Sequence, residues 1–118
     1  MEPRAHLPLQ PRDYLILFTL LSGERHGYGI VKEVEQESGG DVLLDPANLY
    51  RSLKRLIRDG LVRETERRPS AEADGERRRF YQITPLGREV VTLEAQRLTR
   101  LAEAARAKGL APHREKPA

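Results

Sequence analysis

Cysteine is absent from the 118-residue chain, so the sequence offers no disulfide, no thiolate nucleophile and no cysteine-ligated metal site. Long apolar runs are missing as well. The longest stretch, residues 15–21, is interrupted by Thr19 and is far shorter than the roughly 20 residues that span a bilayer. The start, Met-Glu-Pro-Arg, does not have the pattern of a signal peptide. These absences predict a soluble, cytoplasmic chain that has no membrane partner.

Patterns that support catalysis are scarce too. The histidines are scattered, with His6 and His113 in expected tails, and no serine, aspartate and histidine set or metal-ligand spacing is present. His26, beside Gly27, is better explained as a helix-start or packing residue than as a catalytic base. The glycines do not form a phosphate-binding loop. We therefore expect neither an enzyme nor a bound cofactor or metal.

The charge of the chain is unevenly distributed. Hydrophobic residues make up 38% and charged residues 33% of the sequence, which suits one small domain whose modest core favours association with a second copy. The formal net charge of +3 divides into −4 over residues 1–45, +4 over residues 46–83 and +3 over residues 84–118. The basic excess therefore begins in the middle of the chain, where it would suit a polyanionic partner.

Hydrophobic spacing and end signals predict four helices and one hairpin. Two of the helices begin with a capping residue followed by proline, Asp45-Pro46 and Thr84-Pro85. Such a pair supplies a hydrogen-bond acceptor for the first turn and a backbone preset for helix. Glycines follow the helices, as is common where a helix ends. The expected helices cover residues 13–22, 27–38, 46–59 and 85–109, and the expected strands cover residues 61–67 and 80–84.

Three helices followed by a hairpin with a polar tip are the elements of a winged helix-turn-helix. The predicted fold class is accordingly mainly α with a small β-hairpin, followed by a C-terminal dimerisation helix. Residues 1–10 contain two prolines and no hydrophobic period, and are expected to form a flexible arm. The winged domain is expected over residues 11–84, the dimerisation helix over residues 85–109, and a flexible tail over residues 110–118.

The third predicted helix has one apolar and one cationic face. At about 100° per residue, its leucines share one side and its basic residues fall opposite. Basic side chains bind phosphates, and arginine can donate two hydrogen bonds to guanine. This pattern predicts a helix that reads the major groove, although a solvated helix face can look the same. The candidate DNA-contacting residues on this helix are Asn48, Tyr50, Arg51, Lys54, Arg55 and Arg58.

Arginines at the base of the predicted hairpin add a second basic group. They would lie where a wing meets the DNA backbone. Charged strands that discourage edge-to-edge aggregation are the alternative explanation, and acidic residues at the tip weaken the DNA interpretation. The wing candidates for DNA contact are Arg77, Arg78 and Arg79.

Four segments of the chain resemble the PadR family of bacterial transcriptional regulators, specifically its short members with a single C-terminal helix. They are HGYGI at 26–30, LYRSLKRL at 49–56, DGLV at 59–62 and RRFYQITPLG at 78–87, in family order. The resemblance covers about residues 13–90. It implies a homodimer whose last helix packs on the partner's first helix, a palindromic operator, and repression relieved by a small molecule. Ala47-Asn48 departs from the Gly-Thr that the family more often has, which puts the cap and the operator preference in doubt.

The last predicted helix indicates dimerisation independently of the resemblance. One stripe of it extends beyond the winged domain, whereas Leu86, Val90 and Leu93 can pack on their own domain. The first helix is apolar almost all round and is expected to be covered in part by the partner. The predicted dimerisation residues are Leu15, Phe18, Val91, Leu98, Leu101 and Ala105.

Two further interpretations stay open. Winged helices also serve as protein-docking modules, which need no cationic face on the third helix. A small-molecule effector could occupy an apolar cavity at the dimer interface, lined by residues that in most proteins are plain core. The candidate lining residues are Tyr14, Phe18, Leu21 and Tyr28.

Overall fold

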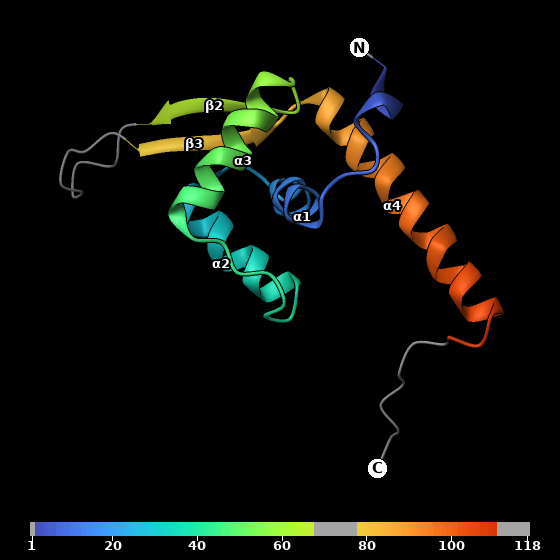
Figure 1. Ribbon diagram of the computed structural model, residues 1–118. Coiled ribbons are helices and arrows are strands. Elements are labelled where there is room, and N and C mark those ends of the chain that lie inside the picture. Colours follow the sequence, from blue (N-terminus) through green and yellow to red (C-terminus); the bar gives the residue numbers. More distant parts are fainter. Residues whose placement is uncertain (1, 68–77, 111–118) are drawn as a thin grey trace.

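The computed structural model describes residues 2–67 and 78–110 and confirms the predicted fold class (Figure 1). Helices and a small antiparallel sheet follow one another in the order expected for a winged helix-turn-helix, and a long helix completes the chain. The elements are η1 (Pro3–His6), α1 (Pro11–Leu20), β1 (Arg25–His26), α2 (Gly27–Glu37), α3 (Pro46–Arg58), β2 (Val62–Arg67), β3 (Arg78–Ile83) and α4 (Pro85–Ala107).

Capping side chains set the first turns of three helices. Asp45 accepts a hydrogen bond from the Asn48 backbone N–H at 2.8 Å, and Thr84 accepts one from the Gly87 N–H. Both caps were predicted from the sequence. The imidazole Nδ1 of His26 accepts from the N–H of Gly29 at 3.1 Å, which confirms His26 as a helix-start residue. Each bond satisfies an N–H that has no partner within its own helix.

The sheet has three strands rather than the two of the expected hairpin. β3 lies in the centre and pairs antiparallel with β2, from Val62 opposite Ile83 to Arg67 opposite Arg78. On its other side β3 pairs with β1 over Arg25–His26. Two residues are too few to show a period of two, so the sequence pattern could not predict β1. The expected polar tip falls on residues 68–77, outside the described part of the chain.

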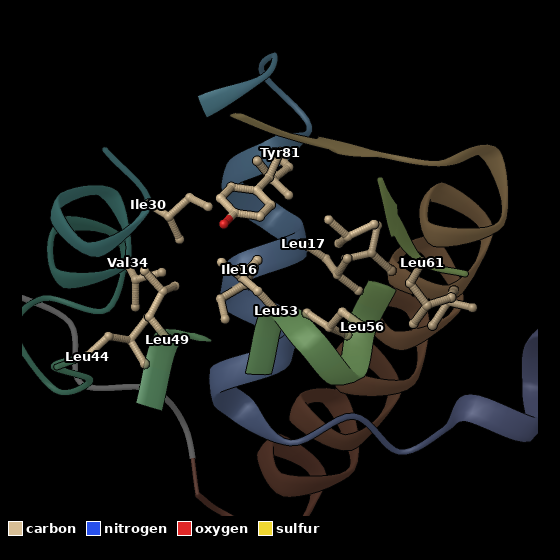
Figure 2. Packing of buried hydrophobic residues seen from close by; sticks show 14 residues of the cluster. Ile16, Leu17, Ile30, Val34, Leu44, Leu49, Leu53, Leu56, Leu61 and Tyr81 are labelled. Carbon is tan, nitrogen blue, oxygen red and sulfur yellow. The ribbon is translucent and has the colours of Figure 1, made fainter. Parts of the chain in front are cut away.

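α1 lies in the middle of the hydrophobic core. Its Ile16, Leu17 and Leu20 are at most 1% exposed, and Figure 2 shows Ile16 and Leu17 among side chains from α2, α3 and the sheet. Full burial of such a side chain contributes about 1.5–3 kcal/mol. α1 is therefore the element against which the others are placed. The core residues that surround it are Ile30, Val34, Leu44, Leu49, Leu53, Leu56, Leu61, Val62, Tyr81, Val90 and Val91.

The N-terminal segment is not the flexible arm that the sequence suggested. η1 lies against α4, and Leu7 and Leu9 pack on the core. The backbone N–H of Leu9 donates to Oε2 of Glu94 at 3.0 Å. Glu94 is 1% exposed and also accepts from Nη2 of Arg97 at 2.9 Å. Two isolated leucines give no hydrophobic periodicity, so the sequence did not predict that this segment packs against α4.

α4 is the longest helix, with 23 residues, and its C-terminal half leaves the winged domain behind (Figure 1). Charged side chains recur along it, including Glu94, Arg97 and Arg100. Within residues 2–67 and 78–110, no helix is both long enough and apolar enough to cross a membrane.

Gly87 is required where α4 passes the end of α3. A Cβ at this position would lie 2.2 Å from the Leu61 carbonyl oxygen and 2.8 Å from a side-chain carbon of Ile83. The clash with backbone cannot be relieved by a rotamer change. We expect Gly87→Ala to lower the free energy of unfolding by about 1–3 kcal/mol, the usual cost of overpacking. Urea unfolding followed by circular dichroism measures it.

Gly29→Ala is the matched control, because Gly29 also donates its N–H to a helix cap but has only ordinary contacts at 3.6 Å or more. The control is expected to be neutral or to stabilise the protein by up to about 1 kcal/mol, since alanine favours helix. Equal stability of Gly87→Ala and the wild type would contradict the close approach of α4 to Leu61.

Glu94 makes the stability of the protein dependent on acid pH. The hydrogen bond from Arg97, assisted by the Leu9 N–H, holds the pKa of Glu94 below its ordinary value although burial acts in the opposite direction. A carboxylate whose pKa is lower in the folded state stabilises at neutral pH, and this contribution is lost as pH falls through the lowered pKa. We expect Glu94→Gln to be less stable than the wild type at pH 7, with the difference shrinking as the pH falls.

Urea midpoints measured from neutral to acid pH test this, with Glu103→Gln as a control on the exposed surface of the same helix. The control should follow the wild type at every pH. A constant gap between Glu94→Gln and the wild type over the whole range would show that the charge of Glu94 is not involved.

Candidate nucleic-acid interface

α3 presents a polar face to solvent and an apolar face to the core. Leu49, Leu53 and Leu56 are buried against α1 and its neighbours, and Ser52 is buried with them. The opposite face is exposed, and its large polar side chains include Tyr50, which is 54% exposed. The exposed residues of this face are Tyr50, Arg51, Lys54 and Arg58, all of which the sequence had marked as DNA-contacting candidates.

A chain of hydrogen bonds orients the first turn of α3. The Asn48 amide donates through Nδ2 to Asp45 Oδ2 at 3.0 Å. Its Oδ1 accepts from Arg51 Nη2 at 2.6 Å. The departure from the family pattern at Ala47-Asn48 therefore leaves the cap intact, because Asn48 is part of it. Asn48 also holds one nitrogen of the Arg51 guanidinium, which keeps this side chain at the N-terminal end of the exposed face.

The helical projection placed Arg55 on that exposed face, but the structure does not. Its Nη2 donates to both carboxylate oxygens of Asp13, at 2.7 and 2.8 Å. The Asp13 side chain is only 7% exposed, whereas that of Arg55 is 35% exposed. The projection was insufficient because Arg55 lies at the border of the two faces, where the tertiary fold brings a carboxylate of α1 within reach. The acidic Asp13 beside an apolar run was the available signal for such a partner.

Arg58, at the end of α3, stays with the exposed set. Its Nε donates to Oδ1 of the adjacent Asp59 at 3.2 Å, and its side chain is 71% exposed. An ion pair this exposed holds its partners weakly, so Arg58 remains accessible to another anion.

The sheet brings Arg79 next to the exposed face of α3. Arg79 lies on β3, is exposed, and its Nη1 is 3.5 Å from Oε2 of Glu64. Together with Tyr50 and Lys54 these two residues line an open hollow of about 400 Å³ between α3 and the sheet. Arg78 is placed on β3 by its backbone, but its side chain, like the whole of Arg77, falls outside the described part of the chain.

Tyr81 forms part of the wall of this hollow. Its phenol is almost fully buried, and burial together with the nearby charge of Glu64 raises the pKa of Tyr81 to about 12. The raised pKa moves the ionisation of this phenol further above physiological pH, so Tyr81 adds no negative charge to the hollow.

Two exposed residues of α2, Tyr28 and Lys32, were not among the DNA-contacting candidates of the sequence analysis. Tyr28, in the first turn of α2, was named only as a lining residue of an effector cavity or as core, but it is 68% exposed. Its ring stacks on His26, and Lys32 Nζ lies 5.5 Å from its centroid. The starts of α2 and α3 come close, because a Cβ on Gly27 would lie 3.8 Å from the Tyr50 hydroxyl. Tyr28 therefore follows directly after the point where α2 approaches α3, and its exposure is not indicated by its spacing in α2.

The predicted dimerisation residues separate into two groups. Val91 is 2% exposed and packs in the core of its own chain, so its assignment to the dimer stripe is wrong. Phe18, Leu98 and Leu101 are exposed, at 37%, 38% and 54%. Leu15 and Ala105 are half-buried. The apolar surface of α4 therefore begins only beyond Glu94, where the helix leaves the domain.

The candidate effector residues do not form one group either. Tyr14 stacks on Phe18 within α1, with ring centroids 6.0 Å apart, whereas Tyr28 stacks on His26 at the start of α2.

Within residues 2–67 and 78–110, no three histidine, aspartate or glutamate side chains are placed to hold a metal ion.

Comparison with known proteins places this architecture. The Transcriptional regulator PadR-like family matches residues 16–93. A 37.1 kDa protein of transposon TN4556 from Streptomyces fradiae is 39% identical over 87 residues, which are 74% of this chain but only 23% of that longer protein. The transcriptional regulator Rv3488 of Mycobacterium tuberculosis is 33% identical over 87 residues, covering 74% of this chain and 75% of the relative.

Solved structures agree on the fold. A PadR family transcription regulator from Clostridium difficile is similar with a TM-score of 0.70 at 21% identity, covering 83% of this chain and 97% of that one. Bacillus subtilis PadR, solved in complex with operator DNA, is similar with a TM-score of 0.59 at 21% identity, covering 93% and 52%. The resemblance noted in the four sequence motifs is confirmed, and the chain belongs to the PadR-like family of transcriptional regulators.

Proposed function

We propose that this protein is a cytoplasmic, sequence-specific repressor that binds a palindromic operator as a homodimer. The observation that carries the proposal is the exposed face of α3, which gathers Tyr50, Arg51 and Lys54 on the second helix of a helix-turn-helix. In such folds this helix enters the major groove and its first residues approach the base edges. Bacillus subtilis PadR, which is similar in fold, was solved with operator DNA.

We propose that basic side chains on β3 and α2 bind the DNA strands that border the major groove. Arg79 on β3 lines the same hollow as Tyr50 and Lys54, and Lys32 lies over the exposed ring of Tyr28 on α2. A phenol hydroxyl and an ammonium can bind phosphate oxygens without reading sequence. We propose that Arg77 and Arg78, which precede Arg79 in the sequence, contact the DNA backbone as well. We propose that Asn48 and Arg51 make the direct contacts with the base edges.

A second copy of the chain is the proposed partner of α4. The C-terminal half of this helix carries Leu98, Leu101 and Ala105 beyond the domain, and α1 exposes part of Phe18. In a two-fold dimer each α4 can cover the α1 of the other protomer, including Leu15, because such an interface uses the same two surfaces twice. The two α3 helices are then related by the same axis, and this requires a palindromic operator. We place a small-molecule effector that relieves repression at this interface.

The DNA interface is tested by the salt dependence of binding. Fluorescence anisotropy is measured with a duplex from the region upstream of the protein's own gene and with a scrambled duplex, at several salt concentrations. The wild type should prefer the upstream duplex. Lys54→Met should weaken binding and reduce the slope of log K against log salt by about 0.9, the effect of one lost phosphate contact.

Lys108→Met provides the control, since Lys108 is exposed and is the C-cap of α4; the C-terminal end of this helix lies far from α3 (Figure 1). It should leave both affinity and slope unchanged. Equal salt slopes for Lys54→Met and the wild type would show that Lys54 does not contact a DNA phosphate. No binding to either duplex at low salt would favour a protein-docking module over a DNA-binding protein.

The dimer is tested at Leu98. Leu98→Glu places a charge on the proposed interface and should give a monomer by light scattering, with weaker binding to the upstream duplex because two half-sites are no longer joined. The fold of the protomer should persist, since Leu98 is exposed within it. Leu43→Glu, at a leucine that is 68% exposed before α3, should leave the oligomeric state unchanged. A Leu98→Glu protein that remains dimeric would refute the α4 interface.

A further inference from the structure

The Asp13–Arg55 ion pair joins the helix at the centre of the core to the helix proposed to read DNA. The two residues are 42 positions apart in sequence, and one guanidinium nitrogen donates to both carboxylate oxygens at 2.7 and 2.8 Å. Asp13 is in the first turn of α1 and Arg55 in the last turn of α3. Each charge therefore lies at the end of its own helix where the helix dipole favours it.

The N-terminal segment lies beside the ion pair. Asp13 and Arg55 line a cavity of about 250 Å³ together with Ala5, His6 and Pro8. Asp13 is 5% exposed as a residue, so its carboxylate depends on Arg55 for compensation. Turning the bound nitrogen of Arg55 toward DNA would leave this charge buried and unpaired, which is strongly unfavourable. Arg55 is thus held in place by the fold.

The leucines that α3 buries in the core around α1 make apolar contacts, which do not determine direction. The contribution of Leu49, Leu53 and Leu56 depends on the apolar area they bury and not on its direction. Such packing tolerates small shifts more readily than a charged hydrogen bond does. The exposed cations Arg51 and Lys54 share this helix with Arg55. Their direction relative to the domain therefore depends on how α3 is rotated about its own axis, which the bond to Asp13 restrains.

We propose that Arg55 is a positioning residue: through Asp13 it sets the rotation of α3 on α1, and so aims the exposed face of α3 at the base edges. This inference rests on the proposed DNA-binding function and assigns Arg55 a role other than DNA contact. Because α1 also carries Phe18, the pair links the proposed reading helix directly to the helix that the partner protomer covers.

The test is a double-mutant cycle on DNA binding with Asp13→Asn, Arg55→Met and the double variant, and with Lys54→Met as the adjacent, exposed control. Anisotropy is measured with the upstream duplex and with the scrambled duplex, at a temperature where circular dichroism shows every variant folded. Each single variant at the pair should reduce the preference for the upstream duplex by about ten-fold, within the range for residues that touch neither ligand. The double variant should lose no more than either single variant.

Affinity for the scrambled duplex and its salt slope should stay unchanged in the Asp13 and Arg55 variants, because phosphate contacts are retained. Lys54→Met should weaken binding to both duplexes. Weaker binding of Arg55→Met to both duplexes, with a slope smaller by about 0.9, would make Arg55 a phosphate contact and overturn the inference.

An altered unfolding midpoint with unchanged preference would make the pair purely structural, which overturns the inference as well. In both of those cases the wild type still prefers the upstream duplex, and the proposed function stands. A wild-type protein that binds neither duplex would end the proposed function and this inference together.

Discussion

Burial of α1 is the constraint on which the rest of the structure depends. Ile16, Leu17 and Leu20 leave almost no surface exposed, and α2, α3, α4 and β3 all contact this helix. A chain of this size can form only one hydrophobic core, so every element must use the same central helix. α3 is thereby held on one side of α1 with its polar face outward, while the N-terminal part of α4 packs on another (Figure 1).

Two buried carboxylates connect this core to the outer elements. Asp13 joins α1 to α3 through Arg55, and Glu94 joins α4 to the N-terminal segment through the Leu9 N–H. Each carboxylate is satisfied by an arginine, as a buried charge requires. Apolar contacts supply the attraction between these elements, and the directional bonds restrict how they can slide on one another. The surface proposed to bind DNA and the surface proposed to form the dimer therefore each lie on a helix that a buried carboxylate joins to a neighbouring element.

Much of the fold could be predicted because it is specified by local chemistry. Asp45 and Thr84 are N-cap residues that mark the starts of α3 and α4, and the apolar spacing of α3 identifies its buried face. The exposed cations Arg51 and Lys54 follow from the same spacing. What could not be predicted involves residues that lack a period or meet a distant partner. β1 is too short for a pattern, residues 2–10 pack through isolated leucines, and Tyr28 is exposed although its spacing suggests core.

The sequence by itself determined the four α-helices and the β2–β3 hairpin, which face of α3 is apolar, and the membership of the chain in its family. These follow from short-range spacing and capping, which a linear pattern records. Only the tertiary structure decided that Arg55 binds Asp13 and that Val91 belongs to the core of its own chain. Whether a side chain at the border of a helix face is exposed or bound within the chain depends on which residues another element places next to it. Helical periodicity gives the direction of a side chain, whereas its partner is set by the packing of the whole domain.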